Sequence, residues 1–406
     1  PASSIQVNPP VGISDPNLSN NYARTGVSDL AITVKDNVYE ARALKVSPGT
    51  KITFANLGAN PHNVVPSNDG QFPAIPTGKL DPTLAQNLSG LIGILNATPD
   101  GSWVRVNLNN YSDVWTPAEL RPLNGTTNPD PSKIIIAWSS FAWDTKRGDL
   151  ILYGGGHANY PGNDVYRWRG STRMWERASL PSEIVLTTNG FHTAIDGVDN
   201  APVSSHTYDN TLYLPIVDRV LTFGGAAYNT GNPYQRPLSA STSSPTGPYL
   251  FDPARADGNK VGGSTGSHVK RVAPHPEVLG GNMWTNRDVF RTAVVGTPPV
   301  SHINGMTAYA TENGKDVVYT AARPGQGTDL TLYRYTLNDI NNIALDKFEV
   351  VGQYWSGPTD QGAGAYDPVR KLFIRTGTQT QPVAYWDLSP TRIDMKDNVE
   401  IGRAHV

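Results

Sequence analysis

Cysteine is absent from the 406 residues of this chain. Its absence excludes disulfides, thiolate metal sites and cysteine nucleophiles. No apolar run approaches the roughly 20 residues that a membrane-spanning helix needs, so we expect no membrane span. Charge of either sign is also scarce, because 33 basic residues nearly balance 35 acidic ones and charged residues make up only 17% of the chain. Without a basic face, nothing in the composition points to nucleic acid as a partner.

Glycine, proline and aromatic residues are abundant instead. The 39 glycines and 33 prolines punctuate many short segments, and the 9 Trp and 18 Tyr suit the strands between them. A low charge content is common in exported β-proteins, and the first residue is Pro1 rather than Met, as expected when a targeting peptide has been removed. The composition predicts an all-β protein that is secreted or lies on an extracellular surface.

Residues 137–178 carry the most informative local pattern. Short aromatic and β-branched segments alternate with polar turns, and a glycine triple at 154–156 separates the second segment from the third. Alternation of this kind buries one side of each strand, and glycine allows the chain a close approach that other residues do not. Four antiparallel strands with this punctuation form one blade of a β-propeller. The predicted strands are 140–143, 150–153, 164–168 and 174–177.

The same pattern recurs further along the chain. The turn Asp144–Arg147 is repeated at Asp367–Arg370, which predicts the same hairpin in two blades. This order, in which a strand is followed by a glycine pair or triple and then by spaced Tyr and Trp, resembles the kelch repeat. The resemblance implies a galactose-oxidase-like β-propeller over residues 99–406. A weaker strand pattern at 101–106 could mark a further blade, and we expect about five to seven blades in total. The predicted later copies are 204–225 with 249–252 and 268–272, then 302–350, then 364–387.

A propeller commonly closes by completing its last blade with a strand from the other end of the chain. We therefore predict that residues 101–106 or 398–401 pair within the blade formed by the opposite terminus. If neither segment did so, an exposed edge would favour strand exchange with a neighbouring molecule.

Residues 1–66 read as a small β-sandwich-like module, cupredoxin-like or immunoglobulin-like, followed by a linker at 67–98 with a short helix between Leu80 and Ile94. Strands are predicted at 30–34, 43–46 and 51–55. The string VSPGTKITFAN, followed by PHNV, resembles the first half of a cupredoxin. The resemblance implies a copper ligand at His62. A blue-copper centre is excluded because the family's thiolate ligand has no counterpart here, and a weaker copper site would need other ligands.

Three histidines are candidates for a functional site. First strands of blades line the central channel, so His206 and His302 are expected near one of its ends, and His157 follows a loop that could reach the same face. Converging imidazoles could hold a metal or act as base and electrophile for a glycan, whereas the structural alternative is that they tie one blade to the next. The predicted binding residues are His157, Asn159, Tyr160, Asn163, Asp164, His206 and His302.

Two classes of function follow. The copper-radical cofactor of galactose-oxidase-like enzymes needs a tyrosine cross-linked to cysteine and cannot form here, so no cofactor is expected beyond a metal at the channel histidines. The first class is a binding or structural module of an extracellular assembly, with other protein subunits or surface glycans as partners, in a homo-oligomer or filament. The alternative is a carbohydrate-active enzyme, a polysaccharide lyase or hydrolase, with a histidine-lined site at the channel. The lack of a complete catalytic set favours the first.

Overall fold

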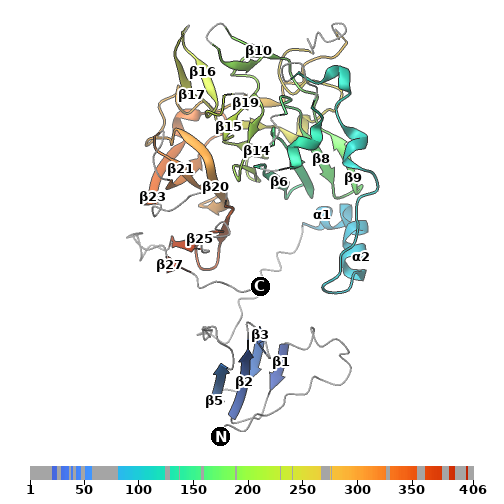
Figure 1. Cartoon of the computed structure of the whole chain (residues 1–406), viewed down its shortest axis with the longest axis vertical. Coiled ribbons are helices and arrows are strands. Elements are labelled where there is room, and N and C mark those ends of the chain that lie inside the picture. Colours follow the sequence, from blue (N-terminus) through green and yellow to red (C-terminus); the bar gives the residue numbers. More distant parts are fainter. Residues whose placement is uncertain are drawn as a thin grey trace. The chain divides into compact units, whose positions relative to one another are not determined.

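The computed structural model divides the chain into two compact units, Pro1–Gly78 with Gly402–Val406 and Lys79–Ile401 (Figure 1). The residues that it describes are 21–24, 29–35, 38–39, 43–46, 51–56, 81–123, 129–136, 138–156, 160–187, 190–228, 230–239, 241–266, 275, 277–325, 330–353, 362–376, 384–388 and 399–400.

The first unit contains two small sheets. Strand β1 (Asn21–Arg24) pairs in parallel with β4 (Ala43–Val46). Strand β2 (Asp29–Lys35) lies between β3 (Val38–Tyr39) and β5 (Lys51–Asn56), antiparallel to the first and parallel to the second. The three predicted strands are confirmed as β2, β4 and β5. They are divided between the two sheets, and a sandwich is not supported.

The second unit is a propeller-like arrangement of four antiparallel sheets, each with four strands (Figure 1). The first blade is β6 (Phe141–Asp144), β7 (Asp149–Leu152), β8 (Tyr166–Arg169) and β9 (Met174–Arg177). The second is β13 (Thr211–Leu214), β14 (Arg219–Thr222), β18 (Tyr249–Phe251) and β19 (Trp284–Asn286). The third is β20 (Ser301–Glu312), β21 (Lys315–Arg323), β22 (Thr331–Leu337) and β23 (Lys347–Gln353). The fourth is β24 (Gly364–Asp367), β25 (Leu372–Arg375), β26 (Ala384–Asp387) and β27 (Val399–Glu400).

The blades pack face to face through apolar side chains. The first strand of each blade lies beside the first strand of the next, β6 with β13, β13 with β20 and β20 with β24. One buried cluster joins Ile151 of the first blade to Trp284 of the second, and another joins Leu221 of the second to Tyr335 of the third. Each fully buried aromatic of this kind contributes about 1.5–3 kcal/mol by its buried area. Apolar contacts therefore cover both faces of the second blade.

The described residues form four blades, so the predicted count of five to seven is not supported. The second blade ends with β19 rather than with 268–272, which lies outside the described residues. The predicted closure is wrong. Strand β27 pairs with β26 of its own blade, and 101–106 forms no strand, with Trp103 fully exposed. A strand supplied by the adjoining chain closes a much shorter loop than one from the far terminus, and so costs less entropy.

Short elements decorate the blades. Helices α1 (Pro82–Asn87) and α2 (Ser89–Ala97) confirm the helix expected near Leu80, and Leu88 between them packs on Gly148 and Gly170 of the first blade. No helix among the described residues is long and apolar enough to cross a membrane. The remaining strands form pairs: β10 (Ile184–Leu186) with β11 (His192–Ala194), β12 (Ser205–His206) with β15 (Ala226–Ala227), and β16 (Gln235–Pro237) with β17 (Ser243–Pro245). The single-turn helices are η1 (Tyr111–Val114), η2 (Ala118–Leu120), η3 (Pro131–Ile135), η4 (Pro253–Arg255) and η5 (Ile343–Leu345).

Candidate functional site

The chain enters the inner strands of the four blades through segments that contact one another. We call residues 138–140, 205–210, 302–306 and 362–364 the hub. The first two segments are joined by hydrogen bonds from the Tyr208 N–H to the Trp138 carbonyl, at 2.9 Å, and from the Ser140 N–H to Thr207 Oγ1, at 2.9 Å. The hub thus begins where the first and second blades meet.

Asn210 ties the second blade to the third. Its side-chain amide donates to the carbonyls of Gly224, at 2.9 Å, and His302, at 2.7 Å. A side chain on Gly305 would place its Cβ 2.7 Å from Asn210 Oδ1, so glycine is needed for this close approach. The neighbouring residue Asp209 forms a parallel bridge with Met306. The backbone of β20 is therefore held against the start of β13.

Asp209 extends the connection to the fourth blade. Its Oδ2 accepts hydrogen bonds from the backbone N–H groups of Thr307, at 3.0 Å, and Gly364, at 2.7 Å. Thr307 Oγ1 also donates to the Asp209 carbonyl at 2.5 Å. Burial raises the pKa of Asp209 to about 7, although the two N–H groups oppose the shift. The carboxyl of Asp209, just before the second blade, thus contacts the third and fourth blades.

Three aromatic rings of the hub lie close to one another. Trp138 and His206 have ring centroids 5.1 Å apart, and Tyr208 lies 6.4 Å from Trp138 and 6.3 Å from His206. All three side chains are half-buried. We call Trp138, His206 and Tyr208 the ring cluster. Two of its members have left-handed backbone, with φ of 57° at Trp138 and 48° at Tyr208. Such a conformation costs a bulky residue roughly 1–3 kcal/mol and is concentrated at functional sites.

Of the two predicted channel histidines in the described part of the chain, only His206 belongs to the ring cluster. His302 is buried, its ring stacks on Phe223 with centroids 4.2 Å apart, and its Nδ1 lies 3.2 Å from Thr320 Oγ1. Burial lowers the pKa of His302 to about 3, which keeps the ring neutral at physiological pH. This geometry is that of a packing residue between the second and third blades.

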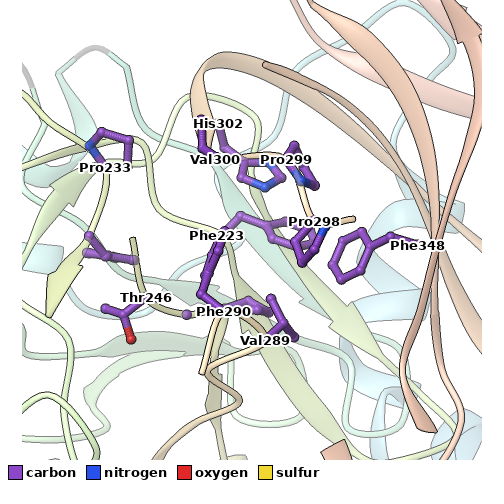
Figure 2. Close-up of a pocket in the computed structure, with 13 residues that line it drawn as sticks. Phe223, Pro233, Thr246, Val289, Phe290, Pro298, Pro299, Val300, His302 and Phe348 are labelled. Atoms are coloured by element: carbon purple, nitrogen blue, oxygen red, sulfur yellow. The ribbon is translucent and has the colours of Figure 1, made fainter. Parts of the chain in front are cut away.

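His302 also lines a small pocket, which Figure 2 shows among Phe223, Pro298, Pro299 and Phe348. Its volume is about 20 Å³. That space holds about one water molecule, whereas pockets for small-molecule ligands span roughly 300–1,000 Å³. The pocket is a packing defect rather than a ligand site.

The loop that carries His157 and Asn159 is anchored at the hub. Both residues lie outside the described residues, as does His62. On one side of the loop, the Gly155 N–H donates to the Ser205 carbonyl at 2.8 Å. On the other side, Ser204 Oγ donates to the Tyr160 carbonyl at 2.6 Å. Both ends of the loop are therefore fixed next to His206.

Tyr160, Asn163 and Asp164 are brought together, but in the interior of the first blade. Asp164 Oδ2 accepts hydrogen bonds from Thr116 Oγ1, at 2.6 Å, Tyr166 OH, at 2.5 Å, and Tyr160 OH, at 3.1 Å. Burial raises the pKa of Asp164, and these hydroxyls oppose the shift. Asn163 Nδ2 donates to the Pro202 carbonyl at 2.8 Å. Because all three side chains are buried, they hold the loop and do not face a ligand.

Within the described ranges, no three His, Asp or Glu side chains are grouped closely enough to hold a metal ion. The sequence analysis missed Trp138, Tyr208 and Asp209. Their signal was positional, since each lies just before the first strand of a blade, where loops carry binding residues on a rigid scaffold. The histidines were predicted from residue type and from their place at the start of a blade, which did not distinguish a packing residue from one at the hub.

No protein-family model matches the sequence, and no curated protein sequence matches it. The fold and the hub therefore carry the functional argument.

Proposed function

We propose that the second unit binds glycans at the hub, as a module of a secreted or surface-exposed assembly. The observation that carries this proposal is the half-buried ring cluster, two of whose three members, Trp138 and Tyr208, have left-handed backbone. Flat aromatic faces pack against the apolar C–H faces of sugar rings, and a few fixed polar groups then set the orientation. The module's other partners are protein subunits of the same assembly.

A carbohydrate-active enzyme is the second candidate, and one observation favours it. Asp209 has a carboxyl pKa raised to about 7 by burial, which suits a general acid or base at neutral pH. A polysaccharide lyase or hydrolase would need a second catalytic group within reach of the same sugar. The described part of the hub offers His206 and Tyr208 for that role.

Asparagine substitutions remove rings of the cluster while keeping a residue that tolerates the left-handed backbone at these positions. We expect Trp138→Asn and Tyr208→Asn to weaken binding of neutral polysaccharides at least tenfold, because asparagine tolerates left-handed backbone but has no ring. Retention of the full chain on a panel of immobilised neutral and acidic polysaccharides would measure this. Trp103→Asn is the matched control, since that Trp is fully exposed outside the hub and its loss should leave retention unchanged.

The two candidates differ in their products. A binding module is retained and releases nothing, whereas a lyase or hydrolase shortens the polysaccharide, as shown by size-exclusion chromatography of the supernatant. Retention that is absent for every polysaccharide, or equal for wild type and Trp138→Asn, would contradict the proposal.

The finer identity of both units belongs to the same proposal. A kelch-type propeller is supported by the glycines that follow β7 and β14, at 154–156 and 224–225. The cupredoxin-like character of the first unit, with a metal role for His62, rests on the motif in the sequence alone. Assembly into a homo-oligomer or filament is likewise part of the proposal.

A further inference from the structure

The contacts between successive blades join the same two kinds of surface each time. In the second blade, large side chains lie in register across the four strands, and they pack in one cluster with Ala142 and Ile151 of the first blade. We call such a set the aromatic row of its blade, and the side of a blade that turns away from its own aromatic row the opposite face. The aromatic row of the second blade is Tyr213, Val220, Phe251 and Trp284.

The third and fourth blades repeat this arrangement. The aromatic row of the third blade packs on Leu221 and Leu250 of the second, and that of the fourth blade packs on Ala310 and Val317 of the third. Large apolar side chains buried in this way give each contact most of its stability. The aromatic row of the third blade is Tyr309, Val318, Tyr335 and Phe348, and that of the fourth is Tyr366, Phe373 and Trp386.

The first blade has an aromatic row that no other blade covers. Its outer end is covered by the chain before the blade, since Tyr111 lies 5.2 Å from Trp175 between ring centroids. The inner end is open, because Trp143 is 46% exposed, whereas its counterpart Tyr213 in the second blade is 4% exposed. Phe141, on the same side of β6, is 38% exposed. The complete row is Trp143, Leu150, Trp168 and Trp175.

The fourth blade has an opposite face that receives no aromatic row. Ala365 and Ile374 are paired across β24 and β25, as Ala142 and Ile151 are across β6 and β7. In the first blade both residues are 1% exposed, whereas in the fourth blade Ala365 is exposed and Ile374 is half-buried. In the described chain, β24 does not pack beside β6 in the way that successive inner strands do. Both halves of a repeated contact are therefore open, at the two ends of the series of blades.

We propose that the aromatic row of the first blade packs on the opposite face of the fourth blade of a second copy, so that copies of the chain join head to tail. This inference rests on the assembly included in the proposed function and names its interface. A second copy is the occupant because it carries the same pair of surfaces that the chain already joins between its own blades. A contact between two different surfaces leaves one of each open, so it extends into a filament unless the copies close into a ring.

The contact between copies is apolar. Between the first and second blades, Arg147 also pairs with Asp218, the last residue of the second blade's hairpin. The first blade has Gly148 at that hairpin position, so Arg370 of the fourth blade would find no carboxylate there. Association should therefore persist at high salt, which screens exposed ion pairs but not apolar burial.

The test uses two variants that each damage one surface. Sedimentation velocity of the full chain should show association that increases with protein concentration. Trp143→Arg and Ala365→Arg should each weaken this association roughly tenfold or more, because a charge enters an apolar contact. An equimolar mixture of the two should form dimers but no larger species, since each variant keeps one intact surface. Leu186→Arg is the control, because Leu186 is 64% exposed on β10, outside the four blades.

A second measurement does not depend on the arginine variants, whose folding is checked by circular dichroism. The chain has no cysteine, so Trp143→Cys and Ala365→Cys each introduce a single thiol. A short bismaleimide should cross-link dimers in a mixture of the two variants, and far fewer in either variant alone.

The inference is overturned by a wild type that stays monomeric at every concentration, by arginine variants that associate as wild type does, or by a mixture that does not recover dimers. It is also overturned if a chain with both cysteines cross-links internally while the mixture does not, because the fourth blade then covers the first blade of its own chain. Glycan binding is judged separately. A monomeric protein whose retention on polysaccharide depends on Trp138 leaves that part of the proposed function standing, whereas association without any retention overturns the glycan proposal alone.

Discussion

Two hairpins with the same sequence pattern turn the first strand of the first blade and of the fourth blade. In the first, Asp144 Oδ1 accepts the N–H groups of Lys146, at 3.0 Å, and Arg147, at 3.1 Å, and Arg147 Nη1 donates to Oδ2 at 2.8 Å. In the fourth, Asp367 makes the equivalent contacts at 2.9, 3.0 and 3.1 Å, the last with Arg370. The local motif is the same in both blades.

The two hairpins differ in their contacts with a neighbouring blade. Arg147 continues to Asp218 of the second blade with two parallel hydrogen bonds, at 2.7 and 2.9 Å. Lys146 Nζ and Tyr213 OH also donate to Asp218, each at 2.7 Å. In the first hairpin the Arg147 side chain is 19% exposed and Asp144 is fully buried. In the fourth, the Arg370 side chain is 58% exposed and that of Asp367 is 19% exposed. The comparison teaches that a short motif fixes a turn, while its contribution to stability depends on what packs against it.

Removing the arginine should give the largest difference in stability between the two hairpins. Arg147→Ala leaves Asp144 buried without its cation, so we expect the free energy of unfolding to fall by about 2–4 kcal/mol. Arg370→Ala removes an exposed pair and should cost about 0.5 kcal/mol or less. Urea unfolding followed by tryptophan fluorescence measures both, and all nine Trp lie in the second unit. Equal losses in the free energy of unfolding for the two variants would contradict the difference between the hairpins.

Lowering the pH should reveal the same difference between the two hairpins, with a smaller change in stability. Burial would raise the pKa of Asp218, but hydrogen bonds from Arg147, Lys146 and Tyr213 outweigh it and lower the pKa. A lowered pKa stabilises the fold above the unfolded value of about 3.9 and loses that stabilisation as pH falls below it. Asp218→Asn should therefore cost about 1–2 kcal/mol at pH 7 and progressively less as pH falls from about 4 toward 2.

Asp367→Asn is the matched variant for this pH series. The pKa of Asp367 is also lowered, with burial opposed by hydrogen bonds from the Arg370 backbone and side chain. Its arginine is exposed, so its pH dependence should be less than half as large as that of Asp218. Unfolding midpoints between about pH 2 and 7 provide the test, and a steeper acid loss for Asp367 would reverse the argument.

Lys146 gives the smallest expected effect. Its Nζ lies 2.7 Å from Asp218, but the side chain is 59% exposed. We expect Lys146→Ala to cost about 0.5 kcal/mol or less, and the difference from wild type to vanish in about 1 M salt. A loss above about 1 kcal/mol that persists in salt would show that the lysine belongs to the buried part of the network.

Strand positions in the second unit were predictable, because their signal is local. Alternation and turn residues placed the four strands of the first blade within two residues, and the two Asp-to-Arg hairpins are confirmed in detail. The fourth strand of the second blade was misplaced because a long polar insertion separates β18 from β19. Over that distance, the pairing of strands depends on contacts that no local pattern records.

The candidate site was less predictable than the strands. His302 has the residue type of a ligand or catalyst, yet packing against Phe223 makes it a neutral core residue. Asp209 has no distinctive motif, and its pKa is raised by burial where the third and fourth blades meet the start of the second. Residue type indicates which reactions a side chain could take part in, but burial and hydrogen bonding decide its charge and accessibility in the folded protein.

The sequence by itself determined the absence of thiolate chemistry, the mostly β character and the turns that define each blade. These properties depend on composition and on residues only a few positions apart. The tertiary structure alone decided how the blades close and which residues meet at the hub. Those outcomes depend on segments that lie far apart in the chain, such as the 155 positions between Asp209 and Gly364. Only the packed blades bring such groups into one low-dielectric environment.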